Sequence, residues 1–128
     1  MTDKEFTDKF LDTFAKNISK KELKKCHVGI KKGCLWNLFG YKLLPCFEGN
    51  KAREEYDKAD KTDAIEIQYA LGWYDTKETS NLSAEHNTAA GIDDSSLNEF
   101  YVVGKDFSWC YVVTHAGDAA GPYFCYAP

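Results

Sequence analysis

The residues best suited to chemistry lie together near the C-terminal end of the sequence. Thr114 and His115 follow an apolar run and precede the glycine-containing segment 117–121. A histidine that ends a strand before a loop can act as a general base, with Asp118 orienting it or with Thr114 or Tyr123 supplying a hydroxyl. We favour a structural role instead, in which the imidazole is at least half buried and hydrogen-bonded to the loop backbone or to a loop side chain.

The five cysteines do not suggest catalysis, metal binding or a disulfide framework. Cys110 lies five residues before His115 on the same predicted strand, so the two side chains point to opposite faces. Cys26 and His27 are the only close pair among the cysteines and histidines, and adjacent side chains rarely bind one ion together. An odd number of widely spaced cysteines is not typical of a disulfide-stabilised protein. We therefore expect reduced thiols, no metal and no cofactor.

A second group of residues suits contact with a protein partner. Trp109, Tyr111 and Val113 share one face of a predicted strand, and tryptophan and tyrosine dominate the energetics of many interfaces. The alternative, which we favour, is that this face belongs to the core. The short acidic cluster at 93–94 lacks the spacing of a calcium-binding loop, which favours a solvated turn. The candidate partner-binding residues are Trp109, Tyr111, His115, Tyr123, Asp93 and Asp94.

Charge is distributed unevenly along the 128 residues. Residues 1–61 carry 14 basic and 10 acidic side chains, whereas residues 62–128 carry 2 basic and 10 acidic ones. The net charge of -4 argues against general affinity for nucleic acid or anionic lipid, and Arg53 is the only arginine available for bidentate phosphate contacts. Nucleic-acid contact through the lysine-rich residues 1–34 is a weaker hypothesis. The acidic C-terminal half suits a cationic protein partner.

Several classes of protein are disfavoured by what the sequence lacks. It contains no apolar run of about 18 residues, no glycine-rich phosphate loop and no nucleophile elbow. The first five residues, Met-Thr-Asp-Lys-Glu, lack the apolar stretch of a secretory signal. We therefore expect a cytoplasmic protein that does not act on membranes or nucleic acid.

Helices are predicted in the first half of the chain. Residues 2–5, Thr-Asp-Lys-Glu, have the spacing of a capping box, and Phe6, Phe10 and Phe14 then recur on one helical face. Three phenylalanines on one face need an apolar partner, so we expect them to pack on a sheet built from the C-terminal strands.

Two further helices and one ambiguous segment follow. Residues 19–22 repeat the capping pattern and predict a short helix that ends near Gly29. Gly49 and Asn50 can cap a third helix, in which Ala52, Tyr56 and Ala59 fall at helical intervals. The apolar segment 33–47 fits a helical turn as well as an extended strand, and we leave both possibilities open.

Beyond residue 63 the apolar period changes to two, which predicts strands. Residues 64–69 alternate apolar and polar side chains. Residues 75–98 are polar and turn-rich, with one helical turn expected between Ser83 and Gly91, and we expect this long loop to be mobile. The remaining strands are predicted at residues 100–103 and 108–114, as a hairpin, and at residues 123–126.

The order of these elements predicts the fold class. Helices first and strands afterwards favour an α+β protein, with the N-terminal helices packed on a small, mainly antiparallel sheet of three to five strands from the C-terminal half. A length of 128 residues suits a single domain over residues 1–128.

Particular segments carry a resemblance to a known family. They are residues 35–41 (Leu-Trp-Asn-Leu-Phe-Gly-Tyr), residues 48–52 (Glu-Gly-Asn-Lys-Ala) and the C-terminal run from residue 100 through Thr114-His115 to residues 121–124 (Gly-Pro-Tyr-Phe). On these residues the chain resembles a family of small bacterial proteins, domain of unknown function 4275, over about two-thirds of its length. The resemblance implies no particular activity.

The chain departs from the family's pattern at two positions. Asn37 stands where a histidine follows the tryptophan of the first motif, and Ala116 stands where an acidic residue follows Thr114-His115. A site that used both histidines and that carboxylate would be incomplete here, which disfavours catalysis.

We therefore expect a non-catalytic intracellular protein-binding module with an unknown protein partner. An immunity-type protein that neutralises a toxin is one form that such a module takes. The alternative is a small hydrolase-like enzyme that uses His115 with Asp118 or with the hydroxyl of Thr114 or Tyr123.

Overall fold

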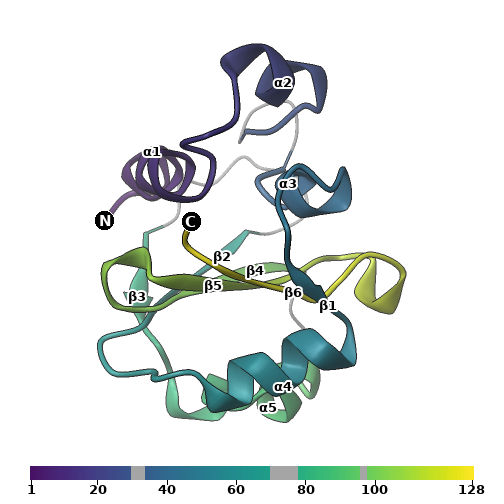
Figure 1. The fold of residues 1–128 in the computed structure, drawn as a ribbon. Coiled ribbons are helices and arrows are strands. Elements are labelled where there is room, and N and C mark those ends of the chain that lie inside the picture. Colours follow the sequence, from purple (N-terminus) through teal and green to yellow (C-terminus); the bar gives the residue numbers. More distant parts are fainter. Residues whose placement is uncertain (30–33, 70–77, 96–97) are drawn as a thin grey trace.

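A sheet forms the middle of three layers. The computed structural model describes residues 1–29, 34–69, 78–95 and 98–128. Figure 1 shows α1, α2 and α3 on one face of the sheet and α4 with α5 on the other. The bounds are α1 (Asp3–Phe14), α2 (Lys20–Lys25), α3 (Asn37–Gly40), α4 (Asn50–Lys58) and α5 (Ala89–Asp93), with 3-10 turns η1 (Ala84–His86), η2 (Lys105–Phe107) and η3 (Gly117–Ala119).

The described residues form a sheet of six strands in the order β1-β6-β5-β4-β2-β3, and each neighbouring pair is antiparallel. The strands are β1 (Phe47–Glu48), β2 (Ile65–Tyr69), β3 (Ser80–Asn81), β4 (Glu99–Val103), β5 (Trp109–Val113) and β6 (Tyr123–Tyr126). The α+β class and the antiparallel sheet from the C-terminal half are confirmed. The expected count of three to five strands is wrong, because β1 and β3 at the two edges have two residues each, too few for an alternating pattern.

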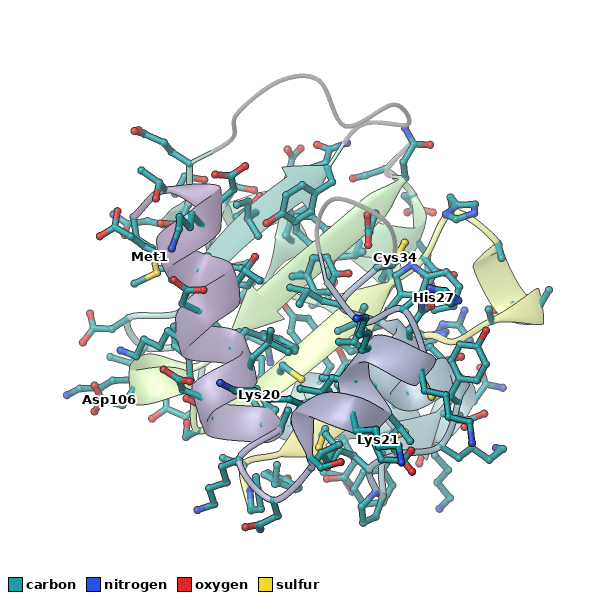
Figure 2. All side chains as sticks on the ribbon, turned by 90° about the horizontal axis from the view of Figure 1, so that it is seen from above. Met1, Lys20, Lys21, His27, Cys34 and Asp106 are labelled. Atoms are coloured by element: carbon teal, nitrogen blue, oxygen red, sulfur yellow. The ribbon has the colours of Figure 1, made fainter. Side chains whose placement is uncertain are left out.

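The first helical layer follows the sequence pattern closely. Thr2 and Glu5 form the predicted capping box, in which the Glu5 amide donates to Thr2 Oγ1 at 3.2 Å and the Thr2 amide donates to Glu5 Oε1 at 3.0 Å. Figure 2 looks onto this layer and shows α1 lying across the strands. The second helix ends at Lys25, earlier than predicted, and the ambiguous segment contributes α3 and the first residue of β1.

Phe6, Phe10 and Phe14 are fully buried and pack on the sheet, as predicted. The rings of Phe6 and Phe10 lie 6.1 and 5.9 Å from the ring of Tyr101 on β4. All three phenylalanines share one apolar cluster with sheet residues that include Val112. Burial of these rings fixes α1 against the middle of the sheet.

The opposite face of the sheet is equally apolar. Tyr56 of α4 stacks on Tyr111 at 4.3 Å and meets Trp109 edge-on at 5.7 Å. Trp109 and Tyr111 are therefore core residues, which is the interpretation that we favoured. Because Phe100 and Val102 face the same way while Tyr101 faces α1, successive residues of the central hairpin are buried on alternate sides.

The polar region between β2 and β4 contains more regular structure than expected. The single helical turn predicted between Ser83 and Gly91 is two short elements, η1 and α5. The Thr88 hydroxyl accepts a hydrogen bond from the Gly91 amide at 3.1 Å and so caps α5. The parts of this predicted loop at 75–77 and 96–97 lie outside the described residues, and its mobility stays a prediction.

We predict that Phe10→Ala lowers the free energy of unfolding by about 3–5 kcal/mol, because a fully buried ring is removed from contact with four other rings. Denaturant unfolding measures the change. Phe47→Ala is the matched control, since Phe47 is 38% exposed on an edge strand, and it should cost much less. Equal costs for both variants would show that α1 is peripheral to the core.

Candidate functional site

An open hollow lies at the end of β5, where Thr114 and His115 leave the sheet. Its volume is about 380 Å³. Its polar lining comes from three separate parts of the chain, namely Arg53 on α4, Asp93 and Ser95 at the end of α5, and His115, Gly117 and Asp118 around η3. Of the residues singled out in the sequence, the hollow thus brings together His115, Thr114, Asp118 and Asp93, and it adds Arg53.

Arg53 organises the polar side of the hollow. Its Nε donates to Asp93 Oδ2 at 2.9 Å, its Nη2 donates to Asp118 Oδ1 at 2.6 Å, and its Nη1 donates to Asn50 Oδ1 at 2.9 Å. The hydrogen bond from Arg53 to Asp118 is the main cause of the raised pKa of Arg53. Both aspartates are thereby held on one planar guanidinium, a donor geometry that matches carboxylates.

The surrounding elements explain why these groups meet. The Asp57 carboxylate of α4 accepts a hydrogen bond from the Ala89 amide at 2.8 Å, which holds the start of α5 beside α4. Asp93, at the end of α5, is thereby positioned next to Arg53. Gly117 adopts a φ of 58°, a left-handed conformation that favours glycine, and this turn brings Asp118 back over α4.

His115 itself is exposed, and its ring meets the Trp36 ring edge-on at 5.9 Å. Within the described residues, His115 makes no hydrogen bond. The prediction of a half-buried, hydrogen-bonded imidazole is therefore wrong. Thr114 performs that task instead, because its buried hydroxyl donates to the Ala120 carbonyl at 2.5 Å and accepts from the Ala116 amide at 3.3 Å.

The residues proposed as catalytic do not form a proton-transfer pair. The Thr114 hydroxyl is occupied by the loop backbone, and Asp118 is bound to Arg53 rather than to His115. Tyr123 is 4% exposed and its ring stacks on Phe39 at 5.6 Å. In the described part of the chain, His115 thus has neither an orienting carboxylate nor a hydroxyl in hydrogen-bonding distance.

The candidate partner-binding residues divide into two groups. Trp109, Tyr111 and Tyr123 are 5%, 0% and 4% exposed, so a partner could touch little of these side chains. Their aromatic character reflects core packing rather than a surface. Asp93, Asp94 and His115 are exposed, and Asp93 and His115 line the hollow.

Asn37, the first departure from the family's pattern, has a structural role. Its side-chain amide donates to the carbonyls of Cys26 and His27, both at 3.1 Å, and so connects α3 to the end of α2. The residue before it, Trp36, contacts His115. The two sequence motifs are therefore neighbours in space.

A carboxyl group that sequence reasoning missed lies close to this contact. Glu99 accepts a hydrogen bond from Tyr101 Oη at 2.5 Å, and Tyr101 Oη accepts one from the Trp36 amide at 3.2 Å. Burial raises the pKa of Glu99, and burial followed by the charge of Glu99 raises the pKa of the neighbouring Cys34 thiol to about 11. The sequence could have predicted that Glu99 and Tyr101 meet, because residues two apart on a strand share a face.

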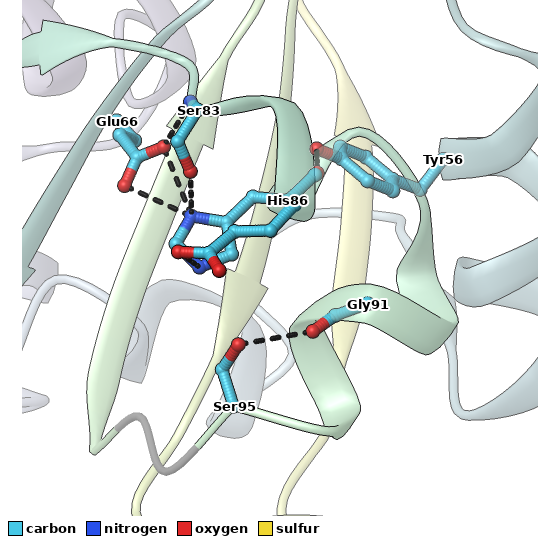
Figure 3. A network of polar contacts seen from close by, with 7 residues as sticks. Tyr56, Glu66, Ser83, His86, Gly91 and Ser95 are labelled. Carbon is cyan, nitrogen blue, oxygen red and sulfur yellow. Dashed lines mark hydrogen bonds and ion pairs between the residues drawn. The ribbon is translucent and has the colours of Figure 1, made fainter.

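A second polar cluster connects β2 to η1 (Figure 3). His86 is 7% exposed, and its Nδ1 lies 3.0 Å from Glu66 Oε1 and 2.9 Å from Ser83 Oγ. The carboxylate and the hydroxyl therefore lie at the same ring nitrogen, whereas a proton relay through an imidazole needs them at opposite nitrogens. The three residue types of a hydrolase are present, but this geometry is that of a structural connection.

All five cysteines lie within the described residues, and all five are free thiols. Burial is the main cause that raises the pKa of Cys46 and Cys125 to about 11 and that of Cys110 well above its ordinary value. Raised thiol pKa values disfavour nucleophilic chemistry. Within the same residues, no group of three or more histidine, cysteine, aspartate or glutamate side chains is arranged to hold a metal ion.

No helix of the described chain combines the length and the apolar character that crossing a membrane requires.

The fold and the hollow define an α+β protein whose antiparallel sheet lies between two helical layers and carries a polar cluster at one end. The sequence matches the family described as Domain of unknown function (DUF4275) over residues 3–124, and the chain belongs to this family. This confirms the resemblance seen in the sequence motifs. No curated protein and no solved structure matches the chain.

The partly buried Glu99 predicts a pH dependence of stability. Its pKa is raised above 4.5 in the folded state, so the folded chain binds this proton more tightly than the unfolded chain. The resulting stabilisation is present below the unfolded pKa and is lost as pH rises through the folded pKa. We expect the wild type to lose stability relative to Glu99→Gln as the pH rises above about 4.5.

Denaturant unfolding of both proteins at several pH values measures this difference. Glu54→Gln removes the same charge at an exposed position of α4 and is the control. A constant difference between wild type and Glu99→Gln across this pH range would contradict the assignment.

The exposure of His115 predicts that its substitution is tolerated. Because the imidazole has no hydrogen bond in the described residues, His115→Gln and His115→Leu should each change the free energy of unfolding by no more than about 0.5 kcal/mol. Thermal unfolding of the two variants tests this. A large loss of stability in the leucine variant alone would contradict this prediction, because it would show that the His115 imidazole makes a structural hydrogen bond.

Proposed function

We propose that the chain is a non-catalytic, intracellular protein-binding module, and that its partner contacts the hollow formed by Arg53, Asp93, His115 and Asp118. An immunity-type protein, which neutralises a toxin by binding it, is the form of this proposal that we place first. The observation that carries the proposal is the state of His115, which is exposed at the rim of a hollow and has no proton-transfer partner in the described residues.

The arrangement suits recognition better than chemistry. A general base needs the substrate proton within reach and a group that orients the imidazole. Here the charged side chains of the hollow are bound to one another, since Arg53 binds Asp93 at 2.9 Å and Asp118 at 2.6 Å. Groups fixed in this way lose little conformational freedom when a partner binds, which favours affinity.

The electrostatics favour a cationic partner. The hollow contains two carboxylates against one guanidinium, and Asp94 is exposed beside it. Residues 62–128 as a whole carry 10 acidic and 2 basic side chains. Complementary charge increases the rate of association with a basic protein and disfavours acidic ones. The intracellular placement rests on the odd number and wide spacing of the cysteines.

A small hydrolase-like enzyme is the second candidate. It is supported by the fact that His115 and Asp118 line the same hollow, so a ligand that displaced Asp118 from Arg53 could bring the two together. Catalytic contacts are often long in the absence of ligand. A broad screen of ester, amide and phosphoester substrates separates the candidates, because hydrolysis that is lost in a folded His115→Ala variant would favour the enzyme.

The proposed function predicts that a specific protein co-purifies with the chain from its native lysate and that the hollow is required. We expect the captured protein to be basic, and its capture to fall at least about tenfold with the double variant Asp93→Asn/Asp118→Asn, since charged contacts of this kind dominate specificity. Quantitative mass spectrometry of the captured fraction is the measurement.

The matched control is Glu54→Gln/Asp106→Asn, which removes two negative charges at exposed positions outside the hollow. This variant should capture the partner as the wild type does. Capture of no protein under several salt conditions, or equal loss with both double variants, would refute the proposal.

A further inference from the structure

The carboxylates of the hollow have hydrogen-bonding capacity that the chain itself does not use. Arg53 occupies Oδ2 of Asp93 and Oδ1 of Asp118. Among the described residues, no donor is bound to Asp93 Oδ1 or to Asp118 Oδ2. The side chains of Asp93 and Asp118 are 39% and 81% exposed, so these second oxygens are open to a ligand from solvent.

Arg53 restricts the positions of both carboxylates. They bind Nε and Nη2 of one planar guanidinium, and both residues line the same hollow. The Arg53 side chain is 24% exposed, and its guanidinium is also bound to Asn50, which restricts its movement. A second cation can therefore be accepted without breaking the first ion pairs, because each carboxylate has several lone pairs.

A buried hydroxyl next to the hollow also lacks a partner. Tyr111 is fully buried, and its Oη forms no hydrogen bond within the described residues. Burial is the main cause of its raised pKa, and the next causes are the charges of Asp93 and Arg53, which act in opposite directions. Tyr111 does not itself line the hollow and its Oη is buried, so a ligand in the hollow would be held by the carboxylates and not by this hydroxyl.

We propose that the hollow receives a single basic side chain, arginine or lysine, from the protein partner, and that Asp93 and Asp118 accept its hydrogen bonds. This inference rests on the proposed function and specifies the chemistry of the same site. The exposed imidazole of His115 at the rim offers a flat surface on which a guanidinium can stack, whereas an ammonium would use the carboxylates alone.

The test is a titration of the ¹⁵N-labelled full chain with three capped tripeptides, Gly-Arg-Gly, Gly-Lys-Gly and Gly-citrulline-Gly. Citrulline has the shape of arginine without its charge. We expect the arginine peptide, the lysine peptide or both to shift the amide signals of Gly117, Asp118 and Asp93, and the citrulline peptide to leave them unchanged. The stronger of the two cationic peptides identifies which side chain the partner supplies.

Asp118→Asn should weaken binding of the cationic peptide about three- to fivefold, the size expected for one exposed ion pair. Asp106→Asn is the matched control, because it removes the same charge from η2, which lies on the opposite side of the molecule from η3 (Figures 1 and 2). Equal shifts with the arginine and citrulline peptides, equal weakening by both variants, or no shift up to the solubility limit would overturn the inference.

The outcome is separable from that of the proposed function. Peptide binding at the hollow without any captured partner would leave the chemistry of the site intact and refute the protein-binding role. A partner that is captured while the cationic peptides fail would keep the protein-binding role and refute the basic side chain.

Discussion

The arrangement of this protein depends on a central hairpin that is buried on both faces. Tyr101, Cys110 and Val112 face the layer of α1, whereas Phe100, Val102 and Tyr111 face α4 and α5. A strand pair with both faces apolar cannot be satisfied by helices on one side alone. The two helical layers are the consequence. One supplies a row of three aromatic side chains, Phe6, Phe10 and Phe14, and the other supplies Tyr56.

This constraint decides where polar groups can gather. The faces of the central strands are occupied, so side chains that need solvent or hydrogen-bonding partners are displaced to the ends of the strands and the connections. One strand end holds Glu99, Thr114 and His115, and the other holds the η2 turn between β4 and β5. The hollow follows from this placement, because α4 and η3 both reach the end of β5 and meet there through Arg53 and Asp118.

The clusters at Arg53 and at His86 show how similar residue types take different roles. His86 is enclosed and bonded to Glu66 and Ser83, so its groups hold β2 and η1 together. His115 is exposed, and the neighbouring charges bind one another rather than the imidazole. Accessibility, and not the identity of the residues, separates a structural cluster from a candidate binding site.

Local patterns in the sequence predicted much of the fold. The capping box of α1, its phenylalanine face and the strands around the central hairpin all depend on neighbours within a few residues, and periodicity reports such neighbours directly. The two-residue edge strands β1 and β3 could not be predicted in this way, because they exist only through pairing with β6 and β2. The short helix α5 was expected only as part of a single turn between Ser83 and Gly91, because its Thr88 cap is recognised only once the helix is known.

The sequence by itself determined the class of the fold, the family, and the position of His115 at the end of a strand. Only the tertiary structure decided what surrounds that histidine. Arg53 and Asp118 are 65 residues apart, and Arg53 and Asp93 are 40 apart, so no local pattern links them. The tertiary structure also decided the burial of Trp109 and Tyr111. Their aromatic face suits an interface as well as a core, and the packing of Tyr56 on α4 against it makes it part of the core. Contacts between distant segments arise from the packing of whole layers, so residue type and local spacing do not predict them.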